Sequence, residues 1–167
     1  MKSVDIIKGK GAGKLKIEKI PDYRIAYVRQ VGPYGPENKE AMEQIKKWAV
    51  ENDLMNDTVI FGIPQDHPAV TRPEHCRYDA CIVIPHDIRL EEGVSEGELI
   101  GGEYLIYKVK HTAEDIQEAW AKVFEGLQDS GYELDHKPIM ERYSNEMISN
   151  HFCELCVPVK RKEGSLI

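Results

Sequence analysis

The sequence predicts an α+β domain in which two βαββ units form a curved antiparallel sheet with two main helices and a central ligand cleft. Three observations predict this fold. The order strand, helix, strand, strand occurs twice along the 167 residues. The halves also match in detail, because "RYDACIVIP" aligns with "FCELCVPV" and "KEAMEQIKKWA" aligns with "QEAWAKVFEGL". A single βαββ unit covers one face of its sheet only, so pairing two units completes a domain. We expect the cleft near the pseudo-twofold axis.

The first unit is predicted to span about residues 14–85. Alternating residues and short apolar runs predict its strands, at 14–20, 24–31, 57–64 and 77–85. Between Glu37 and Asn52 the apolar residues recur at helical spacing, which predicts an amphipathic helix. The proline-containing segment 65–75 is predicted to be a loop.

The second unit is predicted to span about residues 99–160 after a polar, loop-like stretch at 86–98. Its strands are expected at 101–110, 137–143 and 152–160. Helical spacing returns from Ile116 to Leu127, with Thr112 as the predicted N-cap and Gly131 as the predicted stop. "SNEMISN" is expected to be a turn or loop, and the ends of the chain, 1–13 and 161–167, are expected to be loose, with a short strand at 4–7.

The composition restricts the class of protein. With 22 basic and 29 acidic residues and a net charge of −7, the chain is not expected to bind DNA directly, because neutralising phosphates needs clustered Lys and Arg. No segment approaches the roughly 18 apolar residues of a membrane span. Four cysteines without an export signal predict free thiols and a cytoplasmic location. Phosphate-loop, zincin and nucleophile-elbow patterns are absent, so no cofactor is expected.

The cysteines offer two arrangements that could bind a metal ion. Cys153 and Cys156 have the spacing of a zinc knuckle, but positions three apart on a strand face opposite sides. A second arrangement would combine His75, Cys76, His151 and Cys153, because the repeat aligns Cys76 with His151. Strand geometry disfavours the pair, and no metal is predicted.

Glu154 is a carboxylate within an apolar strand. Alternation places it on the face opposite Leu155, Val157 and Val159, which should pack on the helix. Such a group would bind a lipophilic cation or exchange a proton with a ligand. The alternative is that Glu154 faces solvent or pairs with a Lys or Arg.

Aromatic residues could line a pocket that stacks planar ligands. The candidates are Tyr27, Tyr34, Tyr107, Trp120 and Tyr143. Trp120 lies on the apolar stripe of its helix, so ordinary core packing is the alternative.

Five segments in order resemble a known family: "RIAYVRQVGPYG", "RYDACIVIP", "GGEYLIYKV", "AWAKVFEGLQDSGYELDHKPIMERY" and "CELCVPVK". The chain is similar, over about residues 14–160, to the gyrase-inhibitor-like (GyrI-like) domain, the effector-binding domain of AraC-type and multidrug-responsive regulators. The resemblance implies a pocket for lipophilic, aromatic or cationic compounds. It implies an acidic pocket floor at Glu154, with ligand-stacking aromatics at Trp120, Tyr143, Tyr34 and, less directly, Tyr107.

The resemblance leaves three functions open. The chain lacks a helix-turn-helix segment, so a stand-alone module that binds drugs or toxins is expected. A second function is a hydrolase that detoxifies cyclopropanoid alkylating compounds, with Glu154 as acid/base assisted by Tyr107 or Tyr143. A third is inhibition of DNA gyrase through protein contact, or another regulator partner.

Overall fold

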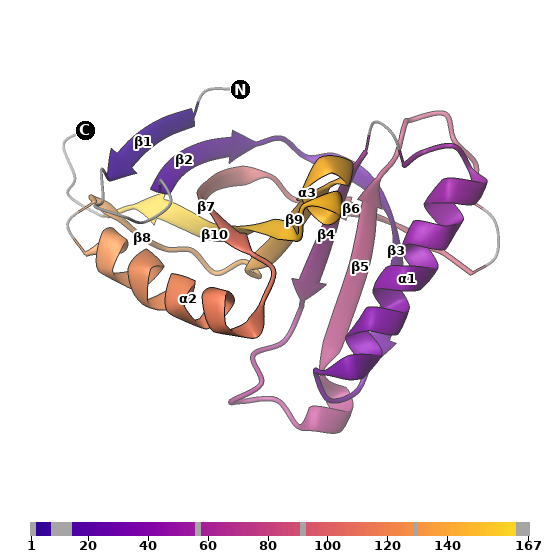
Figure 1. Cartoon of the computed structure of the whole chain (residues 1–167), viewed down its shortest axis with the longest axis horizontal. Helices are drawn as coiled ribbons and strands as arrows, with labels where there is room; N and C mark the ends of the chain where they lie inside the picture. The colour runs from indigo at the N-terminus through magenta and orange to yellow at the C-terminus, as the bar shows by residue number, and fades with distance from the viewer. Residues whose placement is uncertain (1–2, 8–14, 56–57, 91–92, 129, 163–167) are drawn as a thin grey trace.

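The structure is a computed structural model that describes residues 3–7, 15–55, 58–90, 93–128 and 130–162 (Figure 1). Three α-helices are described: α1 (Pro36–Glu51), α2 (Ala113–Leu127) and α3 (Asn145–Ser149). A 3₁₀ turn lies at Pro73–His75. The strands are β1 (Ser3–Ile7), β2 (Leu15–Ile20), β3 (Tyr23–Val31), β4 (Val59–Pro64), β5 (Arg77–Val83), β6 (Ser95–Leu99), β7 (Gly102–Lys110), β8 (Tyr132–Leu134), β9 (Met140–Ser144) and β10 (Phe152–Arg161).

The strands form one antiparallel sheet in the order β1-β2-β7-β10-β9-β4-β5-β3-β6, with β8 paired to β10 off this path. The two central strands, β9 and β4, join the units β9-β10-β7 and β4-β5-β3, which have the same internal order. Helix α1 packs on β3 and β5, and α2 packs on β7. The duplicated α+β fold predicted from the sequence is therefore confirmed.

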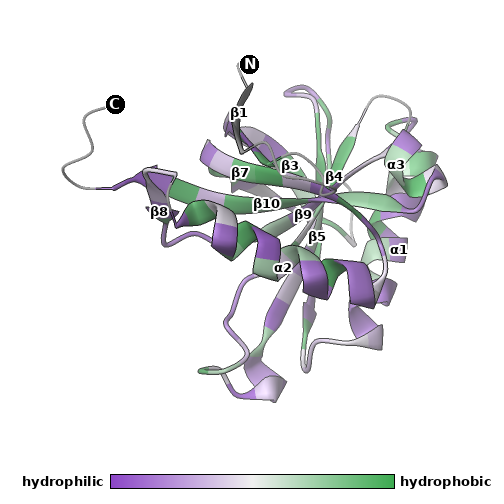
Figure 2. Cartoon of the chain, turned by 60° about the vertical axis from the view of Figure 1, so that its left-hand side comes forward, coloured by the Kyte–Doolittle hydropathy of each residue, from purple (hydrophilic) through white to green (hydrophobic). Residues whose placement is uncertain are grey.

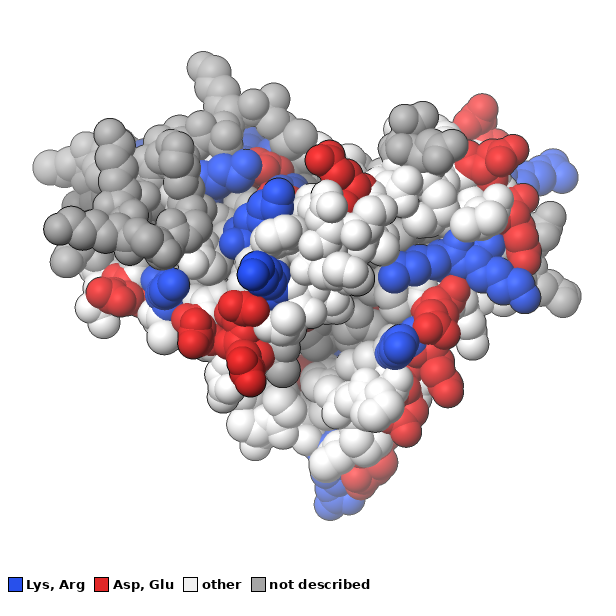
Figure 3. Space-filling view, viewed as in Figure 1, with Lys and Arg blue, Asp and Glu red and all other residues white. Residues whose placement is uncertain are grey.

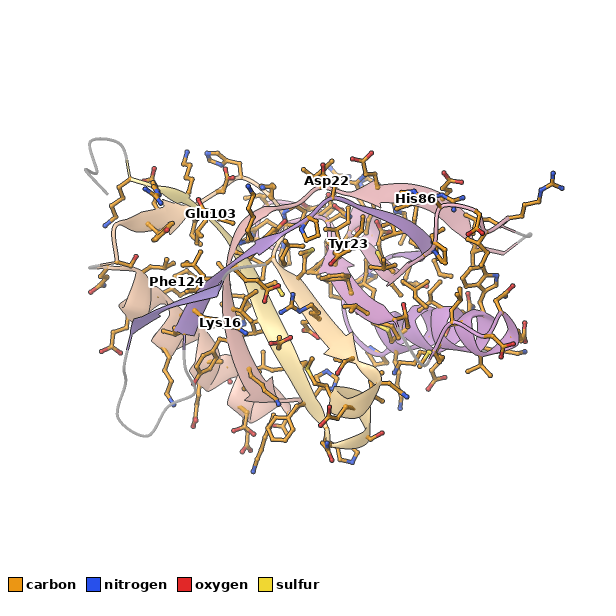
Figure 4. All side chains as sticks on the ribbon, turned by 90° about the horizontal axis from the view of Figure 1, so that it is seen from above. Lys16, Asp22, Tyr23, His86, Glu103 and Phe124 are labelled. Carbon is orange, nitrogen blue, oxygen red and sulfur yellow. The ribbon has the colours of Figure 1, made fainter. Side chains whose placement is uncertain are left out.

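The first strand of each half pairs with the other half. Strand β2 precedes β3 in the chain but pairs with β7, and β6 precedes β7 but pairs with β3. The chain crosses between the halves at Asp22 and Tyr23. Figure 4 labels both residues in the upper middle of the view, with Lys16 of β2 to the left. This exchange ties the two halves together, because neither has its full set of strand partners alone.

The sheet buries side chains on both faces. On β10, Leu155, Val157 and Val159 belong to the core beneath the helices, whereas Cys156 belongs to a second core on the other face. The strand interiors are accordingly apolar beneath α2 (Figure 2). Alternation on this strand was predicted correctly, and it places Glu154 on the face opposite the helices.

Three short elements differ from the expectation. Residues 86–98 were predicted to form a loop, yet β6 begins at Ser95 because its backbone completes the edge beside β3. "SNEMISN" contains the short helix α3, whose Ser144 side chain accepts a hydrogen bond from the Met147 N–H as an N-cap. Strand β8 pairs with the end of β10, so the latter extends to Arg161. No helix in the described part of the chain is long and apolar enough to cross a membrane.

Candidate functional site

A cavity of about 670 Å³ opens on the helix face of the sheet, where the two units meet. Its volume lies within the range of small-molecule pockets. The surface is hollowed between α1 and α2 (Figure 3). One of its lining residues, Glu141 of β9, is paired with Gly62 of β4, at the junction of the two units. The residues that line the cavity are Asn38, Lys39, Met42, Lys46, Tyr78, His111, Glu141, Tyr143, Ile148, His151 and Phe152.

Glu141, Tyr143 and His111 form a polar cluster in this cavity. The Tyr143 hydroxyl donates to Glu141 Oε2, and His111 Nε2 lies 3.2 Å from the same hydroxyl oxygen. Since the hydroxyl hydrogen is committed to Glu141, the Nε2 atom must be the donor in the contact with Tyr143. His111 Nε2 is also 3.7 Å from Glu141 Oε2. The Glu141 side chain remains 32% exposed, so a ligand can reach the carboxylate.

Burial and hydrogen bonding act in opposite directions on this cluster. Burial raises the pKa of Glu141, but the contacts with His111 and Tyr143 outweigh it and hold the pKa below the usual range. Burial, together with the adjacent Glu141 charge, raises the pKa of Tyr143 well above its ordinary value. Near neutral pH the cluster therefore holds a carboxylate beside a phenol that keeps its proton. It can accept a hydrogen bond from a ligand or attract a ligand cation.

Helix α1 supplies one wall of the cavity. Lys39, Met42 and Lys46 follow the spacing i, i+3, i+7, so they share the face of α1 that looks onto the cavity. Burial lowers the pKa of Lys46; the charge of Glu43 opposes this effect, and the charge of Lys39 adds to it. The wall thus combines an apolar thioether with two ammonium groups.

Gly62 lies next to two of the residues that line the cavity, Tyr78 and Met42. A Cβ atom at this position would collide with the Tyr78 hydroxyl and would touch the end of Met42. The missing side chain therefore lets the Tyr78 ring lie across β4, with its hydroxyl at the cavity wall. Burial raises the pKa of Tyr78 well above its ordinary value, so this phenol is also protonated.

The match to a family of known proteins decides the classification. The family model described as the GyrI-like small molecule binding domain matches residues 14–160. This chain belongs to the GyrI-like family. It is 43% identical over 148 residues to YosT, an SPbeta prophage-derived candidate transcriptional regulator of Bacillus subtilis (strain 168), with 88% of this chain and 99% of that protein covered. It is 30% identical over 135 residues to the DNA gyrase inhibitor of Citrobacter rodentium (strain ICC168), with 78% and 85% covered.

Solved structures share the GyrI-like fold at low sequence identity. The EcmrR C-terminal domain matches with a TM-score of 0.66 and 13% identity, over 90% of this chain and 99% of that one. A hydrolase from Listeria innocua matches with a TM-score of 0.62 and 12% identity, over 89% and 93%. SAV2435 bound to tetraphenylphosphonium matches with a TM-score of 0.51 and 12% identity, over 87% and 93%.

Glu154 does not line this cavity. It lies on the opposite face of the sheet, where Arg142 Nε donates to its Oε1 at 3.0 Å. The same guanidinium donates two further hydrogen bonds to Glu18, at 2.6 and 3.0 Å. The ion-paired alternative for Glu154 is therefore the arrangement found. Glu141, and not Glu154, is the acidic residue among the described residues that line this cavity.

Of the aromatic candidates, only Tyr143 lies among the described residues of the cavity lining. Tyr107 is buried in the helix-face core, opposite Leu155. The half-buried Trp120 stacks on Phe124, with ring centroids 6.0 Å apart, and packs against the same core. It therefore follows the core-packing alternative.

The two other tyrosines hold local structure. The Tyr34 hydroxyl accepts a hydrogen bond from the Asp66 N–H at 3.1 Å and donates to the Arg77 carbonyl at 2.8 Å, fixing the loop before β5. Tyr27 lies on the face opposite the helices, and the Arg29 guanidinium carbon is 5.4 Å from its ring centroid. The structure does not bring either ring to the cavity.

The thiols of Cys153 and Cys156 lie on opposite faces of the sheet, as strand alternation predicts. Cys153 belongs to the helix-face core and Cys156 to the opposite core, so this pair cannot grip one metal ion. Within the described ranges, no three potential metal ligands gather at one point. Burial raises the pKa of both thiols to about 12, which makes them unreactive at neutral pH.

The sequence contains a signal for Glu141 that was not used in the prediction. Glu141 and Tyr143 are two apart on β9 and therefore share a face. Since Tyr143 was already assigned to the pocket, strand alternation places Glu141 beside it. The lysines on α1 carry a comparable signal, because they share the helix face of Met42.

Proposed function

We propose that this GyrI-like protein captures small molecules that have an apolar or aromatic body and a cationic or hydrogen-bond-donating group directed at Glu141. The observation that carries the proposal is the accessible Glu141 carboxylate at the floor of a 670 Å³ cavity. Met42, Ile148 and Phe152 supply apolar surface around it. Tetraphenylphosphonium, the compound bound to the related structure SAV2435, has this character of a charged centre within an aromatic body.

The proposed acidic residue is Glu141 in place of Glu154. Glu154 shares Arg142 with Glu18, so its charge is already compensated by a nearby cation. The Glu141 contacts are a phenol and an imidazole, neither of which carries a permanent charge. A ligand cation therefore gains more at Glu141 than at Glu154.

A matched pair of variants tests the assignment. The ethyl ester of rhodamine B, a planar aromatic cation, is titrated against the protein and followed by fluorescence anisotropy. We expect Glu141→Gln to weaken binding by about tenfold or more, since a hydrogen bond to a charged group contributes about 1.5–3 kcal/mol. Glu154→Gln is expected to leave the affinity within about twofold. If Glu154→Gln weakens binding and Glu141→Gln does not, Glu154 is the ligand-binding acid. If neither variant changes the affinity for the dye, neither carboxylate binds it.

Hydrolysis is a second candidate function, favoured by the contact between Glu141, Tyr143 and His111. A carboxylate hydrogen-bonded to a phenol and next to an imidazole can transfer protons to a bound molecule. The related Listeria innocua structure is named a hydrolase. A time course with a cyclopropanoid alkylating compound distinguishes the two functions. Loss of many equivalents of the compound, abolished by Glu141→Gln, would support turnover, whereas a single stoichiometric spectral change would indicate binding alone.

A further inference from the structure

Helix α1 presents two ammonium groups to the cavity, and neither forms an ion pair with a described carboxylate. In the part of the chain that the structure describes, no carboxylate lies within ion-pair distance of Lys39 or Lys46. Lys46 is half-buried, and its pKa is lowered chiefly by this burial. The charge of Glu43, on the same helix, acts in the opposite direction but is the smaller effect, so the Lys46 ammonium is only partly compensated within the protein. An anion placed there would supply the missing partner.

Two further polar groups on the same side of the cavity have no partner within the described residues. The side-chain oxygen of Asn38 is buried without a hydrogen bond, although buried polar atoms are normally paired. The Tyr78 hydroxyl, held over Gly62 at the cavity wall, likewise makes no hydrogen bond there. The Asn38 oxygen, the Tyr78 hydroxyl and the two lysine ammonium groups therefore form one set of polar groups without partners among the described residues, on α1 and β5.

The charges of the lining limit the class of ligand. Glu141 is the one carboxylate among the described lining residues, and Lys39 and Lys46 oppose it with two positive charges. A ligand that is only cationic would gain at Glu141 but would be repelled by both lysines. A ligand that is only anionic would leave the Glu141 charge without a new partner. Met42 lies between the two lysines along α1 and lines the cavity, so it offers apolar contact to the body of a ligand.

We infer that the cavity takes a zwitterionic small molecule, with a cationic or donating group at Glu141 and an acidic group, such as a carboxylate or sulfonate, at Lys39 and Lys46. This inference rests on the proposed function, because it names the ligand class of the same cavity. The acidic group is bound by the ammonium groups and by the Tyr78 hydroxyl. The Asn38 oxygen accepts a donor of the ligand or of water that accompanies it.

Rhodamine B and its ethyl ester test the acidic group, because they differ by one free carboxylate on the same aromatic cation. Both dyes are titrated against the full chain by fluorescence anisotropy. We expect the free acid to bind about tenfold more tightly than the ester, as a charge-assisted contact predicts. Lys46→Met should abolish that preference, because it weakens binding of the acid and relieves the repulsion of the cationic ester, and Lys39→Met should reduce it. Lys47→Met is the matched control, since Lys47 is exposed on α1 and does not line this cavity.

The outcomes separate the inference from the proposed function. If both dyes bind with equal affinity, the acidic subsite is wrong while binding at Glu141 stands. If the preference survives Lys39→Met and Lys46→Met, or is lost in Lys47→Met, the assignment to these lysines is overturned. If neither dye binds, both the proposed function and the inference fail. Circular dichroism of each variant shows that the fold is retained, and a variant that unfolds is replaced by the corresponding Gln substitution.

Discussion

Arg142→Met should destabilise the protein strongly without affecting ligand capture. Arg142 lies on the face opposite the cavity and donates hydrogen bonds to Glu18 and Glu154, which come from two other strands. The exposed fractions of the three side chains are small, at 13% for Arg142, 10% for Glu18 and 13% for Glu154. Methionine keeps much of the length of arginine but removes every donor. Two poorly hydrated carboxylates would then face each other without their shared cation.

The expected loss follows from this burial. Removing one partner of a buried ion pair costs about 3–5 kcal/mol, because the remaining charge stays desolvated. An exposed pair contributes only about 0.2–1 kcal/mol. The Arg77–Asp66 pair provides the comparison, because its contact is 2.9 Å long but the Arg77 side chain is 45% exposed. We therefore expect Arg142→Met to cost several times more than Arg77→Met.

Urea unfolding measures this difference. Trp48 is a buried residue of α1, so its fluorescence, together with circular dichroism, reports unfolding. Combining Arg142→Met with Glu18→Gln and Glu154→Gln should recover part of the loss, since the stranded charges are removed. If Arg142→Met costs no more than Arg77→Met, or if the triple variant is less stable than the single one, the buried-charge argument is refuted.

Two other predictions concern the floor of the cavity and the dependence on pH. Gly62→Ala should lower the free energy of unfolding by about 1–3 kcal/mol and weaken dye binding, because the added Cβ displaces the Tyr78 hydroxyl. The control is Gly35→Ala, where a Cβ meets open space. It should lower the free energy of unfolding by less than about 1 kcal/mol in the same urea assay. Hydrogen bonding to Arg142 lowers the pKa of Glu18 below its ordinary 4.5, so its stabilisation is complete above pH 4.5 and lost as the pH falls through the lowered value. Glu18→Gln should flatten the fall in stability measured below pH 4.5, and an unchanged slope would exclude Glu18 as its source.

The fold could be predicted because the determining patterns are local and repeated. Alternation on β10 separates Leu155 from Cys156, and the spacing of Ala41, Ile45 and Trp48 defines the buried side of α1. Strand β6 was missed because "SEGEL" carries few apolar residues and is a strand through its backbone pairing with β3. Such an edge strand depends on a partner distant in the sequence, which local patterns do not reveal.

The site was harder to predict because alternation identifies a face and not what lies above it. Glu154 was correctly assigned to the face away from the helices, but the cavity is on the helix face, where α1 and α3 supply lining residues. The arginine that neutralises Glu154 is twelve residues away in sequence but directly opposite it in the sheet. Only the order of strands brings them together.

The carboxylates on the two faces of the sheet differ in whether a protein cation pairs with them, and this difference favours Glu141 as the proposed ligand-binding acid. Glu18 and Glu154 share Arg142, and Lys16 Nζ lies 4.0 Å from Glu18, so two acids are balanced by two bases within the protein. A ligand cation entering there would have to displace a buried guanidinium, at a cost comparable to that of breaking the buried pair. Glu141 has no guanidinium or ammonium partner among the described residues, and its carboxylate is accessible from the cavity. Its charge is therefore left for a ligand to balance. On α1, Lys46 lines the same cavity and is offset only in part, by the charge of Glu43, so it presents a charge of opposite sign to a ligand.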